Sequence, residues 1–288
     1  MWFLLAIFSA FFVAIQFALI KHFLKKINVF VLAAGISLSA AFFLMIIAML
    51  QGLPEIKNGF YYAMIGSAVL NFFSTTLYYK ALKIIDLSIA TPLTSFTPIF
   101  LIITSFLMLG EVPSLVGMGG IFLIVFGYYI LSLKKNTNNK YEKITVKSFN
   151  SRGVWYMLAV AFLYSISSNF DKLAVKNSDP VFGSAMVALL LGLLFAFVAI
   201  LKKNEVRIKF RENINKFLLV GAISALSMVA INTAMLIQIV PYVISIKNIS
   251  ILFSVLIGII VFKEKNAKEK IWGAVIMLAG VMLIVLYK

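Results

Sequence analysis

Long apolar stretches alternate with short polar connections along the whole chain. A membrane core about 30 Å thick is crossed by a helix of about 20 apolar residues. The uncharged stretches cover residues 2–20, 29–54, 58–79, 87–110, 112–133, 153–170, 180–201, 217–246, 248–262 and 271–287. This pattern predicts an all-α membrane protein with ten transmembrane helices.

The boundary between the eighth and ninth stretches is the least obvious, because only Lys247 interrupts the apolar run from 217 to 262. Pro241 lacks the N–H group that continues a helix and therefore predicts a break. The run is long enough for two spans, which we expect to be joined by a tight turn near Tyr242.

The amino-acid composition supports a membrane location. Hydrophobic residues make up 62% of the chain and charged residues 12%, whereas soluble domains average about 45–50% and about 25%. So few charged side chains cannot cover a soluble surface, which excludes a cytosolic or disordered chain. The net charge of +16 comes from basic residues in short runs between apolar stretches, which indicates topology and not a nucleic-acid partner.

Residues that carry redox, metal and nucleophilic chemistry are scarce. The chain has no cysteine, which excludes disulfides, zinc-thiolate sites and thiol nucleophiles. Its single histidine, His22, lies among lysines beyond the first apolar stretch and is typical of a solvated loop residue. We therefore expect no enzyme activity, no metal site and no cofactor.

The basic residues are shared unevenly between two sets of connections. The odd-numbered connections carry 21 Lys and Arg residues, the other connections and the C-terminus carry 4, and Lys247 lies within a span. Because positive charge stays on the cytoplasmic side, this distribution predicts a multi-pass protein of the cell membrane with both termini outside.

The two halves of the chain resemble each other. A shift of 153 residues aligns Ala81 with Ala234, Phe100 with Phe253, Glu111 with Glu264, Gly120 with Gly273 and Gly127 with Gly280. Each half has five spans, an odd number, so the second half enters the membrane in the opposite sense from the first. We expect inverted five-helix repeats at 1–135 and 153–288, separated by a basic cytoplasmic linker at 136–152.

Several residues of the first half also resemble a family motif. Ala81-Leu82 precedes a short charged turn, Pro98 lies within the fourth stretch, Gly110-Glu111 ends it, and Gly120 and Gly127 are spaced along the fifth. This order resembles the EamA-type transporters of the drug/metabolite transporter superfamily.

The second half departs from this motif at two positions. Ile251 stands where the first half has its proline, and Lys263 replaces the glycine before the glutamate. The resemblance covers essentially the whole chain and implies a ten-span, two-repeat fold and a secondary transporter. An amino acid or related metabolite as the solute, including its export, is an expectation that rests on this resemblance.

Polar residues deep inside the apolar stretches are candidates for solute binding, because they are costly in hydrocarbon unless they face a partner or a water-filled cavity. A positive charge at Lys247 would bind a carboxylate or phosphate; the alternative is that its stem snorkels to the outer interface. The repeat alignment places Lys247 opposite Thr94. The substrate-binding candidates are Lys247, Thr94, Ser95, Asn169, Asn232, Gln16 and Asn71, and the candidate structural hinges are Pro92, Pro98 and Pro241.

The carboxylates argue against one coupling mechanism. Glu111, Glu264, Asp86 and Asp171 all fall at or near the ends of the predicted spans, so coupling through an intramembrane carboxylate is disfavoured. We expect Glu111 and Glu264 to cap short turns or to pair with lysines. The glycines of the fifth and tenth stretches favour close helix packing, either within the chain or between the protomers of a homodimer.

Together these features predict a secondary transporter that moves a small organic solute across the lipid bilayer by alternating access. The alternative is a flippase or scaffold for a lipid-linked intermediate, which would need a lateral opening between helices.

Overall fold

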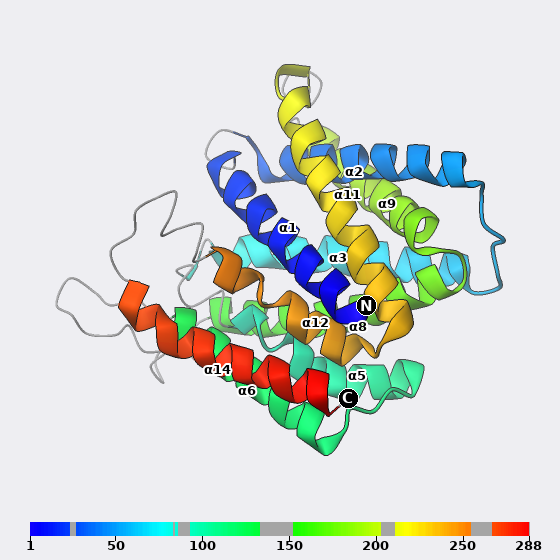
Figure 1. Cartoon of the computed structure of the whole chain (residues 1–288). Coiled ribbons are helices and arrows are strands. Elements are labelled where there is room, and N and C mark those ends of the chain that lie inside the picture. The colour runs from blue at the N-terminus through cyan, green and yellow to red at the C-terminus, as the bar shows by residue number, and fades with distance from the viewer. Residues whose placement is uncertain are drawn as a thin grey trace. The chain divides into compact units, whose positions relative to one another are not determined.

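The computed structural model describes residues 1–23, 27–82, 84–85, 93–132, 152–202, 211–254 and 267–287. Within these residues the chain forms ten helices and no strand (Figure 1). The helices are α1 (Trp2–Phe23), α2 (Val29–Gln51), α3 (Phe60–Leu82), α5 (Thr97–Leu109), α6 (Leu115–Ser132), α8 (Arg152–Lys176), α9 (Pro180–Leu201), α11 (Ile214–Ile237), α12 (Val240–Lys247) and α14 (Ala267–Leu286). The predicted all-α fold is confirmed.

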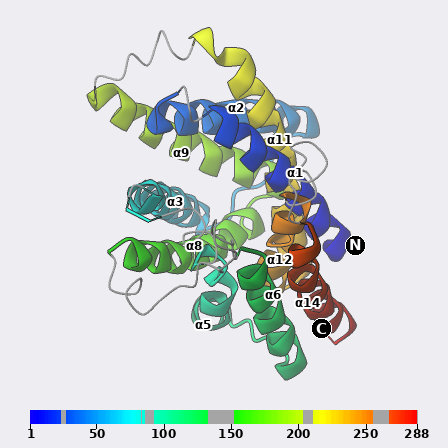
Figure 2. The ribbon, with the colours of Figure 1, turned by 90° about the vertical axis from the view of Figure 1, so that its left-hand side faces the viewer.

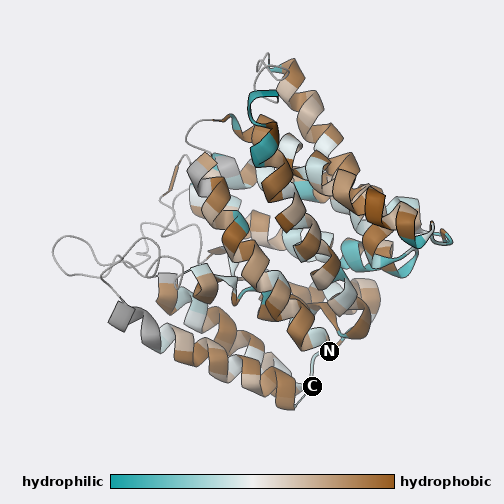
Figure 3. Cartoon of the chain, turned by 45° about the horizontal axis from the view of Figure 1, so that its top comes forward, coloured by the Kyte–Doolittle hydropathy of each residue, from teal (hydrophilic) through white to brown (hydrophobic). Residues whose placement is uncertain are grey.

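Apolar residues dominate these helices (Figure 3). Among the described residues, α1, α2, α8, α9 and α11 are each long and apolar enough to cross a membrane. Large side chains such as Phe17, Phe197 and Leu219 remain exposed on them. Because exposing apolar surface to water is unfavourable, these side chains suit contact with lipid.

The boundary between the eighth and ninth spans differs from the prediction. α11 ends at Ile237 and α12 begins at Val240, so the expected eighth stretch, 217–246, contains two helices. Pro241 lies in the first turn of α12, where a missing N–H is tolerated because that group has no partner within the helix. The turn therefore lies before Val240 and not near Tyr242.

α8 is longer than the sixth apolar stretch predicted. The prediction ended this span at Phe170, but the helix continues to Lys176. Asp171 and Lys172, whose charges ended the apolar stretch, are therefore inside the helix. Each has a hydrogen-bond partner elsewhere in the chain, which makes its position within a span tolerable.

The chain forms two compact units. The first is Met1–Phe72 with Phe170–Gln238, and the second is Phe73–Asn169 with Ile239–Lys288. α3 and α8 each contribute one end to the first unit and the other end to the second.

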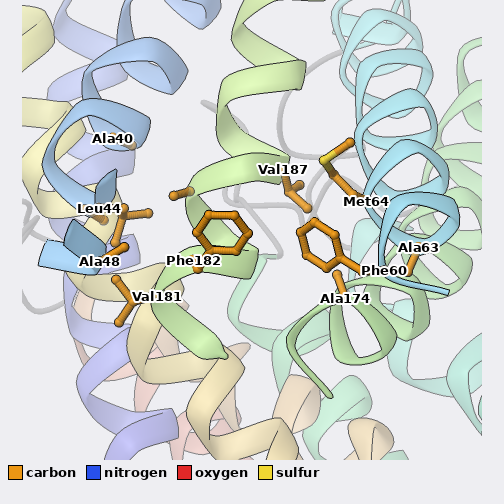
Figure 4. Packing of buried hydrophobic residues seen from close by; sticks show 12 residues of the cluster. Ala40, Leu44, Ala48, Phe60, Ala63, Met64, Ala174, Val181, Phe182 and Val187 are labelled. Atoms are coloured by element: carbon orange, nitrogen blue, oxygen red, sulfur yellow. The ribbon is translucent and has the colours of Figure 1, made fainter. Parts of the chain in front are cut away.

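In the first unit, α2 packs against α9, and α11 packs against α1 and α2 (Figure 2). The core includes Leu44, Phe60 and Phe182, and the ring centroids of Phe60 and Phe182 are 5.7 Å apart (Figure 4). Phe30 near the start of α2 lies 6.4 Å from Phe195 in the second half of α9, whereas Leu44 in the second half of α2 clusters with Phe182 at the start of α9, so these helices run antiparallel. α2 and α9 are repeat equivalents, and an inverted repeat requires them to run in opposite directions.

In the second unit, α6 and α14 pack antiparallel through glycines (Figure 2). A Cβ atom at Gly120 would lie 2.7 Å from the Gly280 carbonyl oxygen, and one at Gly127 would lie 2.7 Å from the Gly273 carbonyl oxygen. Because the repeat pairs Gly120 with Gly273 and Gly127 with Gly280, the two contacts are equivalent. The prediction of close packing is confirmed. Since these glycines are used within one chain, they give no support to a homodimer.

Replacing Gly120 with alanine is expected to destabilise the protein, because the added Cβ atom meets the α14 backbone, which cannot rotate away. Overpacking of this kind costs about 1–3 kcal/mol. Gly119→Ala is the matched control, because nothing lies within 4 Å of a Cβ atom there. Thermal unfolding in detergent should show a lower Tm for Gly120→Ala only. Equal Tm values for the two variants would contradict the glycine contact.

Candidate functional site

The fourth and ninth spans are interrupted at equivalent positions. In the fourth span a turn at Ser95 and Phe96 precedes α5, and in the ninth a turn at Asn248 and Ile249 follows α12. The shift of 153 residues places Ser95 on Asn248 and Phe96 on Ile249. The interruption is therefore shared by the two repeats.

The backbone hydrogen bonds at the two interruptions also match. The N–H to carbonyl bonds run from Phe96 to Leu93 and from Ile99 to Phe96 in the fourth span, and from Ile249 to Ile246 and from Leu252 to Ile249 in the ninth. Each bond joins residues three apart, so both spans tighten locally into a 3₁₀ turn. Such a turn in the middle of a helical span often marks a functional hinge.

A proline accompanies only one of the two turns. Pro98, in the first turn of α5, cannot donate to the Thr94 carbonyl oxygen, which instead accepts a hydrogen bond from the Thr97 hydroxyl at 2.8 Å. Ile251 is the equivalent residue of the ninth span, and its N–H donates to the Asn248 carbonyl oxygen at 3.2 Å. The ninth span therefore turns without a proline.

Lys247 and Asn248 place two hydrogen-bond donors at the interruption of the ninth span. Lys247 is partly buried and ends α12, about 10 Å along the helix from Val240 at a rise of about 1.5 Å per residue. Lys247 therefore lies farther from the start of its span than it would if the turn were near Tyr242, as the sequence predicted. The Asn248 side-chain nitrogen is buried and has no hydrogen-bond partner among the described residues. Leaving such a donor unpartnered costs about 1–3 kcal/mol.

Thr94 and Ser95 occupy the equivalent positions in the fourth span. Ser95 is buried, and the Thr94 side chain is hydrogen-bonded to Tyr128 of α6. α5 packs against α12 within the second unit, so the two interruptions belong to neighbouring helices. The structure thus brings the candidates Lys247, Thr94 and Ser95 into one unit.

Asn169 belongs to the same unit, but its side chain is used in a contact between helices. The Ser105 hydroxyl donates to Asn169 Oδ1 at 2.6 Å, and Asn169 Nδ2 donates to the Thr104 hydroxyl at 3.1 Å. All three residues are buried. Asn169 therefore joins α8 to α5, and a solute would have to displace one of these bonds to reach it.

Three further candidates belong to the first unit. Asn232 Nδ2 donates to the Ser184 hydroxyl at 2.6 Å and joins α11 to α9. Asn71 Nδ2 donates to the Ser67 hydroxyl at 3.1 Å within α3. Gln16 is partly buried on α1. Of the predicted hinge prolines, Pro98 and Pro241 lie in first turns of helices, and Pro92 lies outside the described residues.

A polar cluster ties the start of α12 to the turn between α5 and α6. The Val240 N–H donates to Glu111 Oε2 at 2.7 Å, and the Ser114 N–H donates to the Tyr242 hydroxyl at 2.8 Å. The expected capping role is confirmed for Glu111, whereas Glu264 lies outside the described residues. α12 therefore has one end held at this turn and the other end interrupted.

Comparison with known proteins identifies a family whose model matches this chain. The model of the EamA-like transporter family matches residues 1–133 and 151–286. An uncharacterized transporter of Archaeoglobus fulgidus is 27% identical over 227 residues, which cover 76% of this chain and 74% of that protein. A solved structure described only as "Crystal structure of protein" aligns with a TM-score of 0.80 over 100% of this chain and 99% of its own, at 14% identity, and so supports the fold alone.

The family match covers both halves of the chain and every described helix. It makes the chain a multi-pass membrane transporter and not an enzyme, as the sequence motifs predicted. This protein belongs to the EamA-like transporter family.

Proposed function

We propose that this transporter moves a small organic solute with an anionic group, such as an amino acid, and binds that group at the interruption of the ninth span. The observation that carries the proposal is the buried Asn248 side-chain nitrogen, which has no partner among the described residues and adjoins Lys247. An ammonium and an amide N–H suit the two acceptor oxygens of a carboxylate. A hydrogen bond to such a charged group contributes about 1.5–3 kcal/mol.

Transport by alternating access is supported by the matching turns. Inverted repeats give a transporter two conformations in which the halves exchange roles, with the solute site near the repeat interface. The 3₁₀ turns at Phe96 and Ile249 supply equivalent positions at which the fourth and ninth spans can bend. The side chains at these turns differ, so the solute group is held mainly by the second repeat.

Lys247→Met is expected to weaken transport of the carboxylated solute selectively. Radiolabelled leucine, phenylalanine, threonine and glutamate are first tested for saturable counterflow in proteoliposomes. For the amino acid that exchanges, the variant should raise KM by about 10–100-fold, since about 1.4 kcal/mol corresponds to tenfold. The KM of its decarboxylated amine should not change, because that compound lacks the bound group.

Lys216→Met serves as the control, because Lys216 is bonded to Asn213 at the start of α11. An unchanged KM in Lys247→Met would contradict the anion site. A wild-type protein that exchanges no solute but scrambles labelled lipid would support the flippase alternative instead.

Asn248→Leu is expected to weaken binding of the same solute without lowering the stability of the protein, because the replaced donor has no protein partner among the described residues. Asn232→Leu is the matched control, because it removes a donor bonded to Ser184 and should lower Tm. Thermal unfolding and counterflow are measured for both variants. A Tm loss in Asn248→Leu equal to that of Asn232→Leu would indicate that Asn248 serves packing.

We also propose that both termini lie outside, from the 21-to-4 division of Lys and Arg. The natural absence of cysteine allows a direct test with Glu55→Cys and Asn139→Cys. An impermeant maleimide applied to intact cells should label the Glu55→Cys variant only, and permeabilised cells should label both. The reverse pattern would place the termini in the cytoplasm.

A further inference from the structure

Asp171 belongs to the first unit and lies away from the end of helix α8. The Lys57 N–H donates to the Asn177 carbonyl oxygen at 2.9 Å, so the start of α3 and the end of α8 are at the same level. Asp171 is six residues before Asn177, about 9 Å along α8 at about 1.5 Å per residue. Its partner Ser67 is seven residues after Phe60, about 10 Å along α3 by the same rise.

A directed chain of hydrogen bonds ends at this carboxylate. Asn71 Nδ2 donates to the Ser67 hydroxyl at 3.1 Å, and the Ser67 hydroxyl donates to Asp171 Oδ1. Ser67 is fully buried, while Asn71 and Asp171 are partly buried. The arrangement keeps an ionisable group inside a membrane span, and such groups are rare there and usually functional.

Helices α3 and α8 pack closely beside the chain of hydrogen bonds. Phe170 lies against Gly66, where a Cβ atom would come within 3.0 Å of its ring, and its ring is 5.4 Å from that of Tyr62. Gly66 and Phe170 directly precede Ser67 and Asp171, so α3 and α8 approach closely at this level.

Asp171 shares the helices of the first unit with few other charged groups. α2 and α9 contain none. The titratable residues that the other helices contribute to this unit are Lys21 and His22 on α1, Tyr61 and Tyr62 on α3, Lys172 and Lys176 on α8, and Lys216 on α11. The Lys172 ammonium donates to the Gln238 carbonyl oxygen at 2.9 Å, and Tyr61, Tyr62 and Lys176 are exposed.

We propose that Asp171, held by Ser67 and Asn71, is a proton-binding site, and that loading and unloading this site drives solute transport. A proton from water on one side joins an Asp171 carboxylate oxygen and leaves to water on the other side, with no other bond made or broken. The coupling rests on the proposed transport function, whereas the proton site does not. The position of Asp171 inside α8 revises the expectation that the carboxylates lie at or near the ends of the spans.

The position of Asp171 in the chain suits coupling. α8 passes from the second unit to the first between Asn169 and Phe170, and α3 passes from the first to the second between Phe72 and Phe73. Asp171 and Asn71 are each within two residues of these passages. A change of charge at Asp171 therefore falls where both helices leave one unit for the other.

Infrared difference spectroscopy of the reconstituted protein tests the site without any solute. The carboxylic acid C=O bands of wild-type protein across a pH series should include one component from Asp171, and the Asp171→Asn variant should lack only that component. The asparagine keeps an acceptor oxygen for Ser67, so packing is preserved. Glu111→Gln is the matched control, because Glu111 is bonded to a backbone N–H at the start of α12, and it should retain the Asp171 component.

The coupling is tested with the amino acid that gives counterflow. In proteoliposomes with a pH gradient, one proton per neutral solute allows about tenfold accumulation per pH unit. Asp171→Asn should abolish this accumulation while keeping counterflow, which a packing defect would not do. Identical pH difference spectra of Asp171→Asn and wild type would overturn the proton site, and wild-type transport that does not respond to the pH gradient would overturn the coupling.

Discussion

Inside a bilayer the backbone N–H and C=O groups have no water to bind, so a span can be interrupted only where the protein itself satisfies them. The fourth and ninth spans meet this requirement in the same way, with bonds between residues three apart at Phe96 and Ile249. The Thr97 hydroxyl covers the one carbonyl that Pro98 leaves without its usual donor. The chain can therefore turn in mid-span and present polar side chains at that level.

The two repeats share their helix packing and their turns, but they differ in the polar side chains at those turns. The glycine contacts between α6 and α14 obey the repeat, as do the two turns. The side chains at the turns do not, because Lys247 and Asn248 in one half correspond to Thr94 and Ser95 in the other. Asp171 is a further departure: near the start of each half a shift of 151 residues aligns Lys21 with Lys172, and it places Ile20 on Asp171. The proposed anion site and the proposed proton site thus each lie in only one of the two repeats.

The sequence predicted the helix number, the repeat and the glycine packing, because hydrophobic length and residue spacing encode them directly. It misplaced the α11–α12 boundary and ended α8 too early, because charge was taken as the end of a span although a buried partner such as Ser67 can keep a charged residue inside one. Asn248 was not among the candidates, although it adjoins Lys247. Its importance depends on the turn that leaves its nitrogen buried, and no local signal such as proline marks that turn.

The interruption of the ninth span is proposed to hold the anionic group of the solute, and a crystal structure with the exchanging amino acid bound would test this most directly. We expect a carboxylate oxygen within hydrogen-bond distance of both Lys247 Nζ and Asn248 Nδ2. A carboxylate held by other residues, with Asn248 Nδ2 still unpartnered, would contradict the anion site.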